Sequence, residues 1–230
     1  MSPIINASRA FVNPPFYSFY TFFSHGRRGG ERETLDAVFV IFYTECMNER
    51  LSVCGVEYRI VRLLGHGKGG YSYLAERDGR PVVLKQIHHE PCSYYTFGNK
   101  IEAERHDYER LMRAGVRIPR MLAVDADAER IVKEYIEGET VFDLVKNGAS
   151  AEPYLDQVRA MAEQAKACGL NIDYFPTNFV VSGGLLYYVD YECNDYSDEW
   201  SFENWGVRYW SRTPEFCAYL DHLRRTEELQ

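Results

Sequence analysis

Apolar and polar residues alternate along much of the first half of the chain, the pattern expected when successive side chains point to opposite faces of a sheet. Five segments show this alternation or are rich in strand-forming residues: 57–65, 71–77, 80–87, 120–125 and 130–136. Asp78-Gly79 separates the second from the third, a dipeptide that favours a two-residue hairpin turn. These segments predict an antiparallel sheet.

Helical spacing of apolar residues appears in three later segments, 99–115, 152–169 and 214–229. The first two end at a glycine, as helices commonly do. Between the second and third lies "NFVVSGGLLYYVDYE", which predicts a hairpin across Gly183-Gly184. A β-rich first half with one helix, followed by a helix-rich second half with one hairpin, predicts an α+β protein.

Composition narrows the choice of class. The 230 residues suit one domain or one two-lobed domain, and a chain that is 46% hydrophobic can form a core. The net charge of −8 disfavours nucleic acid or an anionic membrane as the main partner. The six cysteines form no C-x-x-C pair, so neither a zinc site nor a disulfide framework is indicated. Buried thiols in a cytoplasmic protein are therefore expected.

The first 46 residues differ from the rest in their many aromatic side chains. Their longest apolar run, 37–43, is far shorter than the about 20 residues that span a bilayer. Met47 then opens a stretch that resembles a natural protein start. We interpret residues 1–46 as an accessory segment or the product of an upstream start codon, and 47–230 as the functional domain.

A glycine-rich turn joins the first two predicted strands. In "LLGHGKGGYSYLA", Gly65, Gly67 and Gly70 have the spacing G-x-G-x-x-G. Dinucleotide-binding folds place these glycines between a strand and a helix, whereas here they lie between two strands. Without a Cβ, such a turn lets backbone N–H groups approach phosphate oxygens. A merely flexible turn is the alternative.

Lys85 ends the strand "VVLK" and could reach phosphates as a compact cation if an acid held it. Glu104 lies nineteen positions later, near the start of the next predicted helix. Glu102 is the second candidate, although it lies on another face of the helix. Solvated helix charges are the alternative for both glutamates.

The stretch "GLNIDYFPTNFVV" contains Asp173 and, five positions later, Asn178, the skeleton of a kinase catalytic loop. A kinase usually has histidine two positions before this aspartate, but here the residue is Asn171. Asp190 follows in "YYVDYE". Asp173 is thus either a catalytic base or an aspartate in a turn.

From about Val56 to Arg212 the chain resembles the protein kinase-like superfamily, because these motifs and the hinge-like "KEYIEG" (133–138) occur in its order and approximate spacing. The resemblance implies a two-lobed fold. Its β-rich N-lobe would span about 52–134, its hinge 135–138, and its minimal helical C-lobe 139–230.

The resemblance also implies a role for each residue, with ATP and Mg²⁺ as cofactors. The glycines would cover the phosphates, Lys85 would hold them with support from Glu104, and Asp173 would accept or orient the proton of the acceptor hydroxyl. The remaining implied contacts are backbone groups of Glu134 and Ile136 to adenine, and Asn178 and Asp190 to Mg²⁺.

Several positions depart from the protein kinase pattern. Ile172 replaces the arginine before the catalytic aspartate, Phe175 stands where Ser/Thr kinases usually carry lysine, "DYE" replaces D-F-G, and no A-P-E occurs. "VDYE" is similar to the corresponding motif of choline and ethanolamine kinases. Only 40 residues follow Asp190, and in this short C-terminal part the chain also resembles the small kinase of the KEOPS complex and lipopolysaccharide kinases.

Three functional hypotheses follow. The chain is a kinase that phosphorylates a hydroxyl of a protein Ser/Thr or a small molecule, or a nucleotide-binding pseudokinase that regulates other proteins, or an α+β domain with accidental motifs. From Asp190 to Asn204 the chain contains six acids, Asp190 included, and no Lys or Arg. This stretch favours a cationic acceptor, either an amine-bearing small molecule or a basic protein segment. The three tryptophans of 200–210 are expected in the core.

Overall fold

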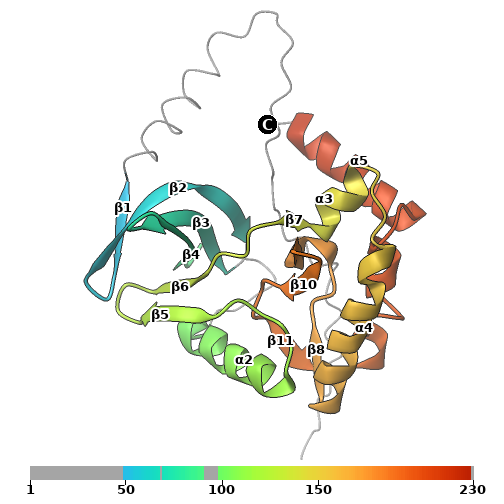
Figure 1. Ribbon diagram of the computed structural model, residues 1–230, viewed down its shortest axis with the longest axis horizontal. Helices are drawn as coiled ribbons and strands as arrows, with labels where there is room; N and C mark the ends of the chain where they lie inside the picture. The colour runs from blue at the N-terminus through green and yellow to red at the C-terminus, as the bar shows by residue number, and fades with distance from the viewer. Residues whose placement is uncertain (1–48, 68, 91–97, 229–230) are drawn as a thin grey trace, which may run out of the picture.

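The computed structural model describes residues 49–67, 69–90 and 98–228. The interpretation of residues 1–46, and the predictions for Cys46 and Cys92, lie outside the described residues. Within them the protein has an α+β fold whose main element is a curled antiparallel sheet, drawn in blue to yellow-green in Figure 1.

The main sheet has six strands in the order β1-β2-β3-β4-β6-β5, and every neighbouring pair is antiparallel. The strands are β1 (Arg50–Val53), β2 (Val56–Gly67), β3 (Gly70–Arg77), β4 (Arg80–Ile87), β5 (Met121–Asp125) and β6 (Arg130–Glu134). All five predicted strands are confirmed. The edge strand β1 was missed because four residues carry too little periodicity to predict a strand.

Both predicted hairpin turns are confirmed by their backbone angles. Asp78 and Gly79 have φ of 51° and 75°, and Gly183 and Gly184 have φ of 57° and 79°. Two successive residues with positive φ match the turn whose twist suits a two-residue hairpin. The first turn joins β3 to β4, the strand that carries Lys85.

Helix α2 (Lys100–Ala114) packs beside the sheet and matches the predicted segment 99–115. The Asn99 side chain caps its start by accepting a bond from the Glu102 N–H at 3.1 Å. Gly115, with φ of 76°, ends it in the left-handed conformation. These two caps set where the helix begins and ends.

The rest of the chain, called the helical part below, lies on the right of Figure 1. Its helices are α3 (Val141–Lys146), α4 (Glu152–Ala167) and α5 (Pro214–Glu228), and its 3₁₀ turns are η1 (Pro176–Asn178), η2 (Asp198–Trp200) and η3 (Gly206–Tyr209). Two small sheets accompany them, β10-β9-β7 and β11-β8. Their strands are β7 (Glu139–Thr140), β8 (Leu170–Ile172), β9 (Phe179–Ser182), β10 (Leu185–Tyr188) and β11 (Cys193–Asp195).

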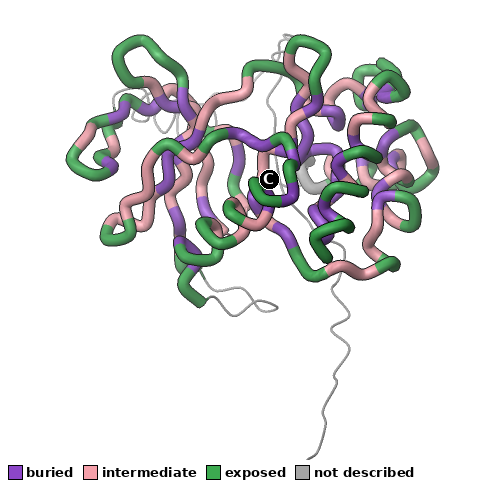
Figure 2. Tube along the Cα trace, turned by 60° about the horizontal axis from the view of Figure 1, so that its bottom comes forward, coloured by how far each residue is buried: buried purple, intermediate pink, exposed green. Residues whose placement is uncertain are grey.

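The hydrophobic core is divided between these two parts, as the purple segments of Figure 2 illustrate. One cluster fills the sheet, and the largest fills the helical part. Leu111 and Ala114 of α2, with Val116 and Ile118 after it, belong to the larger cluster. The end of α2 therefore links the sheet to the helical part.

The tryptophan expectation is confirmed most clearly by Trp210, which is 2% exposed and donates its indole N–H to Tyr174 O at 2.8 Å. Trp205 is half-buried and packs against the same core. Trp200 is also half-buried and packs edge-on to Trp205. The segment 200–210 is therefore largely structural.

The expectation of buried thiols is wrong for two cysteines. Cys54 and Cys168 are exposed, whereas Cys193 is buried and Cys217 is half-buried. Cys54 sits in the turn after β1, and Cys168 follows the last residue of α4, positions at which the chain reaches the surface. In the described part of the chain, no helix combines the length and apolar character needed to cross a lipid bilayer.

Candidate functional site

The glycine-rich turn is a tight β-hairpin directly above Lys85. Gly67 ends β2 opposite Gly70, which begins β3. A Cβ on Gly70 would lie 2.4 Å from Gln86 O, so no larger residue fits there without displacing backbone. A Cβ on Gly69 would lie 3.8 Å from Lys85 Nζ. The hairpin tip thus lies against the Lys85 ammonium group.

Lys85 forms an ion pair with Glu104 of α2, and the two side chains are only 12% and 15% exposed. Glu102 is exposed and pairs instead with Arg105 at 3.0 Å. The first-choice glutamate is thus the one that contacts Lys85. The second Glu104 oxygen, Oε2, is buried without a hydrogen-bond partner among the described residues.

A second lysine, Lys133 of β6, lies in the same region and was missed from the sequence. It is 5% exposed, donates to Val189 O at 3.0 Å, and its Nζ lies 4.3 Å from the centre of the Tyr191 ring. Burial lowers the pKa of Lys133, and the Lys85 charge lowers it further, while Glu104 and Asp190 act in the opposite direction. The available signal was a lysine directly after the apolar pair Ile131-Val132 in the predicted strand "RIVKEYI".

We expect the stability advantage of the parent protein over Lys133→Met to grow as pH rises toward the ordinary lysine pKa of about 10.4. Because the folded-state pKa is depressed, the folded chain releases this proton before the unfolded chain does, so stability rises with pH in that window. Denaturant unfolding of both proteins from pH 7 to 10 measures the difference. A difference that is constant or falls with pH would contradict the depressed pKa.

Asp173 directly follows β8, at the start of a loop held by several hydrogen bonds. Its Oδ1 accepts from the Phe175 N–H at 3.0 Å, and its own N–H donates to the Tyr188 hydroxyl at 3.3 Å. Asn171, in the position where kinases usually carry histidine, is buried and donates from Nδ2 to Ser197 O at 2.7 Å. The Asn171 side chain therefore connects the start of this loop to the backbone at Ser197.

Asn178 lies between Asp173 and the chain that carries Asp190. Its Nδ2 donates to Asp173 O at 3.4 Å, and its backbone carbonyl accepts from the Val189 N–H at 2.9 Å. Burial raises the pKa of Tyr188, and the charges of Asp190 and Asp173 raise it further. Asn178 bonds to the backbone of Asp173 and of Val189, so the fold brings Asp173, Asn178 and Asp190 together.

The donor set suits a hard cation. The Asn178 side chain is 1% exposed, and its Oδ1 has no hydrogen-bond partner among the described residues. A buried amide oxygen without a donor is unfavourable unless a ligand satisfies it. With the Asp190 carboxylate nearby, these are the oxygen ligands that Mg²⁺ accepts while retaining its own waters. Asn178 and Asp190 thus fit the predicted metal role.

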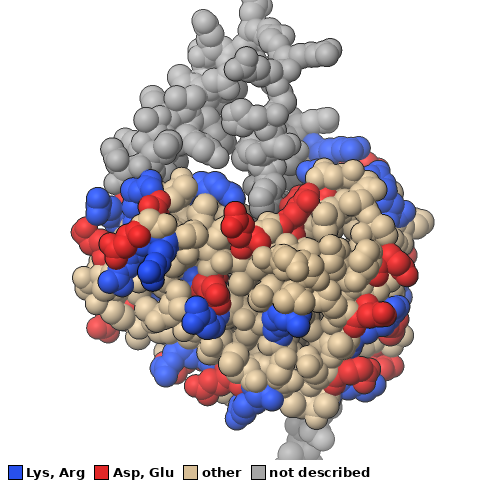
Figure 3. Space-filling view, viewed as in Figure 1, with Lys and Arg blue, Asp and Glu red and all other residues tan. Residues whose placement is uncertain are grey.

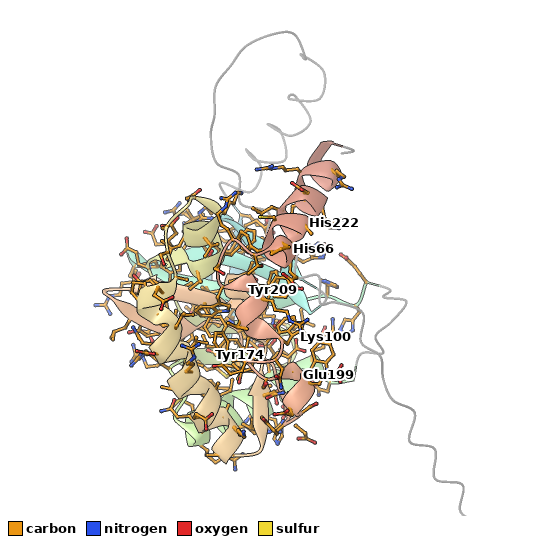
Figure 4. The ribbon with its side chains drawn as sticks, turned by 90° about the vertical axis from the view of Figure 1, so that its right-hand side faces the viewer. His66, Lys100, Tyr174, Glu199, Tyr209 and His222 are labelled. Carbon is orange, nitrogen blue, oxygen red and sulfur yellow. The ribbon has the colours of Figure 1, made fainter. Side chains whose placement is uncertain are left out.

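Phe175, which replaces the usual lysine of Ser/Thr kinases, is a core residue. It is 3% exposed, and its ring lies 5.1 Å from that of Tyr209 on η3 and 4.8 Å from that of Tyr219 on α5. Figure 4 labels Tyr209 beside the helical C-terminal segment. A charged side chain would be costly here, so the departure at Phe175 reflects packing.

The predicted hinge, 135–138, connects β6 to β7 without regular secondary structure. Glu134 is the last residue of β6, and its N–H donates to Arg120 O at 2.9 Å. Ile136 lies in the connecting segment and is half-buried. A Cβ on Gly138 would lie 2.0 Å from Val181 O, so the chain passes directly against β9 there. Adenine contacts by Glu134 and Ile136 stay a prediction.

The acidic stretch after Asp190 is partly neutralised by the fold. Arg110 of α2 contacts Asp195 at 2.9 Å, and Arg159 of α4 contacts Glu203 at 2.8 Å. On the face shown in Figure 3, basic and acidic side chains are interspersed around a broad uncharged area. The negative potential of the stretch is therefore weaker in the fold than its sequence alone suggests.

Comparisons with known proteins place the chain in no established family. No protein-family model matches the sequence, and no curated protein is significantly similar to it.

Proposed function

We propose that the protein is a Mg-ATP-dependent phosphotransferase with a two-lobed, protein kinase-like fold. One observation carries the proposal: the largely buried ion pair between Lys85 and Glu104. Lys85 lies on β4, the strand that follows the glycine hairpin, and Glu104 lies on α2, the next helix. Protein kinases require a lysine–glutamate pair in these two elements. The placement of Asp173, Asn178 and Asp190 near one another supports the same function.

Each part of the site has a task in this proposal. Backbone N–H groups of the glycine hairpin approach phosphate oxygens where a Cβ would obstruct them, and Lys85 contributes a positive charge. Glu104 holds Lys85 in position. Asn178 and Asp190 hold Mg²⁺. Mg-ATP, when bound, supplies the transferable phosphoryl group and the cation that offsets its charge.

Asp173 accepts or orients the proton of the acceptor hydroxyl. Its Oδ1 is fixed by the Phe175 N–H, and its backbone by Tyr188 and Asn178. A base held in this way loses little entropy when the acceptor arrives. We retain a cationic acceptor, an amine-bearing small molecule or a basic protein segment, because the stretch from Asp190 to Asn204 contains six acids and no Lys or Arg of its own.

The second candidate is a nucleotide-binding pseudokinase. Lys133 favours it, because this buried side chain donates to Val189 O at 3.0 Å, directly beside Asp190, where a positive charge could partly replace a bound cation. The two candidates agree on nucleotide binding and differ in turnover. A phosphate-transfer screen across proteins, sugars and amino alcohols separates them.

We expect Mg-ATP to stabilise the parent protein by about 2.7 kcal/mol at 100 times its dissociation constant, because a ligand that binds only the folded state adds to stability. Lys85→Ala and Asp190→Ala should each reduce the shift, measured against the melting temperature of the same variant without nucleotide. Glu102→Ala, on the exposed face of α2, is the matched control. An unchanged melting temperature of the parent in saturating Mg-ATP would exclude the nucleotide-binding hypothesis.

A further inference from the structure

Beside the glycine hairpin, on the surface, three side chains converge that have no task in the proposed reaction. His66 is near the end of β2, while His88 and Glu90 follow β4. One potential ligand atom from each, an imidazole nitrogen or a carboxylate oxygen, lies within 4.8 Å of the others. Two elements that are distant in sequence therefore contribute to one small cluster.

Two of the three distances within the cluster match a tetrahedral metal site. His66 Nε2 lies 3.2 Å from His88 Nε2 and 3.4 Å from Glu90 Oε2. Zinc–ligand bonds of about 2.0–2.1 Å at the tetrahedral angle separate two ligand atoms by about 3.3–3.4 Å. The third separation, between the ligand atoms of His88 and Glu90, adjusts easily because the Glu90 carboxylate ends an exposed side chain.

A neighbouring side chain already orients the carboxylate. The Tyr71 hydroxyl donates to Glu90 Oε1 at 2.5 Å, which leaves Oε2 toward His66. The Tyr71 ring also stacks on the His66 imidazole, with ring centres 4.3 Å apart and planes 6° from parallel. Outer partners of this kind fix ligand orientation in metal sites.

We propose that His66, His88 and Glu90 form a zinc-binding site that joins the glycine hairpin to the segment after β4. Two imidazoles and one carboxylate form a zinc ligand set that leaves one position for water. Imidazole nitrogen also favours zinc over magnesium or calcium. This site uses no cysteine, so the spacing of the cysteines could not have indicated it.

Binding exchanges two existing contacts of His88 for a metal bond. In the metal-free protein its Nδ1 accepts from the Glu90 N–H at 3.2 Å, and its Nε2 lies 2.9 Å from Gly67 O. Zinc requires the Nε2 lone pair, so the single proton of the neutral ring must move from Nε2 to Nδ1 by exchange with water. Gly67 is only half-buried and Glu90 is exposed, so water can replace both contacts.

Zinc binding would restrain the movement of the glycine hairpin relative to the segment after β4. Lys100, labelled with His66 in Figure 4, already connects the hairpin to the segment after β4, because its Nζ donates to Gly69 O at 3.4 Å and to His88 O at 2.5 Å. Zinc would add a second connection at the outer end of the hairpin. The hairpin tip should therefore open less often when zinc is bound.

The test is a titration of the full chain with Zn²⁺ against a chromophoric chelator, with no nucleotide present. We expect one equivalent to bind, and Co²⁺ to give the visible absorption of a tetrahedral site. Tyr71→Phe, which removes only the outer partner, should weaken binding about 10- to 100-fold. His66→Ala and Glu90→Gln, which remove ligands, should weaken it more. Backbone hydrogen exchange at residues 66–71 should slow with zinc in the parent and not in His66→Ala or Glu90→Gln.

The matched control is His89→Ala, because His89 adjoins the cluster but contacts Glu129 at 2.7 Å. It should bind zinc like the parent. Thermal unfolding in chelator should show that all variants are folded. The proposal is overturned if the parent binds no zinc, if His66→Ala and Glu90→Gln bind it as well as the parent, or if Cys54→Ser rather than His66→Ala abolishes binding. Since ATP is absent, failure here leaves the proposed function untouched.

Discussion

Asp173→Asn is expected to bind Mg-ATP like the parent and to transfer phosphate about 10²- to 10⁴-fold more slowly, the usual contribution of a positioned acid or base. Asparagine keeps the acceptor oxygen for the Phe175 N–H, so the loop should retain its conformation. What the variant loses is the carboxylate that takes or orients the acceptor's proton. In the proposed site this residue faces the acceptor, whereas Lys85 and Asp190 face the nucleotide.

The measurement is transfer from labelled ATP to the best acceptor of the screen, with nucleotide affinity determined in parallel. Asp156→Asn is the matched control, because this aspartate is fully exposed on α4 and the substitution is the same. Asp190→Asn should lose both binding and transfer. If Asp173→Asn transfers phosphate at the parent rate, Asp173 is a turn residue and has no catalytic role.

Glu104→Gln is expected to lower the free energy of unfolding by about 2–4 kcal/mol, whereas Glu102→Gln in the same helix should change it by about 0.5 kcal/mol or less. Removing one charge of a buried pair leaves the other uncompensated, at about 3–5 kcal/mol, and the 12–15% exposure of this pair reduces the cost. Lys133 adds to the effect, because without Glu104 two ammonium groups remain close together.

Denaturant unfolding of the three proteins at neutral pH measures both changes. The double variant Lys85→Met/Glu104→Leu should be more stable than Glu104→Gln, because it leaves no lone charge at the position of the pair. Equal effects of Glu104→Gln and Glu102→Gln would mean that the Lys85–Glu104 contact contributes nothing beyond a surface ion pair. This experiment needs no substrate, so it tests the site geometry independently of the proposed function.

Elements with a local cause were predictable from the sequence. Asp78-Gly79 and Gly183-Gly184 specify hairpins because their backbones favour positive φ, and Gly115 ends α2 for the same reason. Alternating and helical spacing located five strands and three helices, since burial of one face imposes the period. Short elements such as α3, β7, β8 and β11 were not predicted, because two to six residues show too little of either period.

The candidate site was predictable only as a set of positions. The motifs indicated Lys85 and two possible partners, but the rotation of α2 against the sheet decides that Glu104 points inward and Glu102 outward. Lys133 became part of the site because β6 runs beside β4 in the sheet, a pairing between residues about fifty positions apart.

Charge and metal chemistry depended most on tertiary structure. The acidic stretch contains no arginine, yet packing of α2 and α4 brings Arg110 and Arg159 to it. Likewise His66 and the pair His88 and Glu90 are more than twenty positions apart, and only the pairing of β2 with β3 and of β3 with β4 brings them together. Sequence periodicity reports which face of an element is buried, whereas contacts between distant side chains depend on strand register and helix rotation, which the complete core determines.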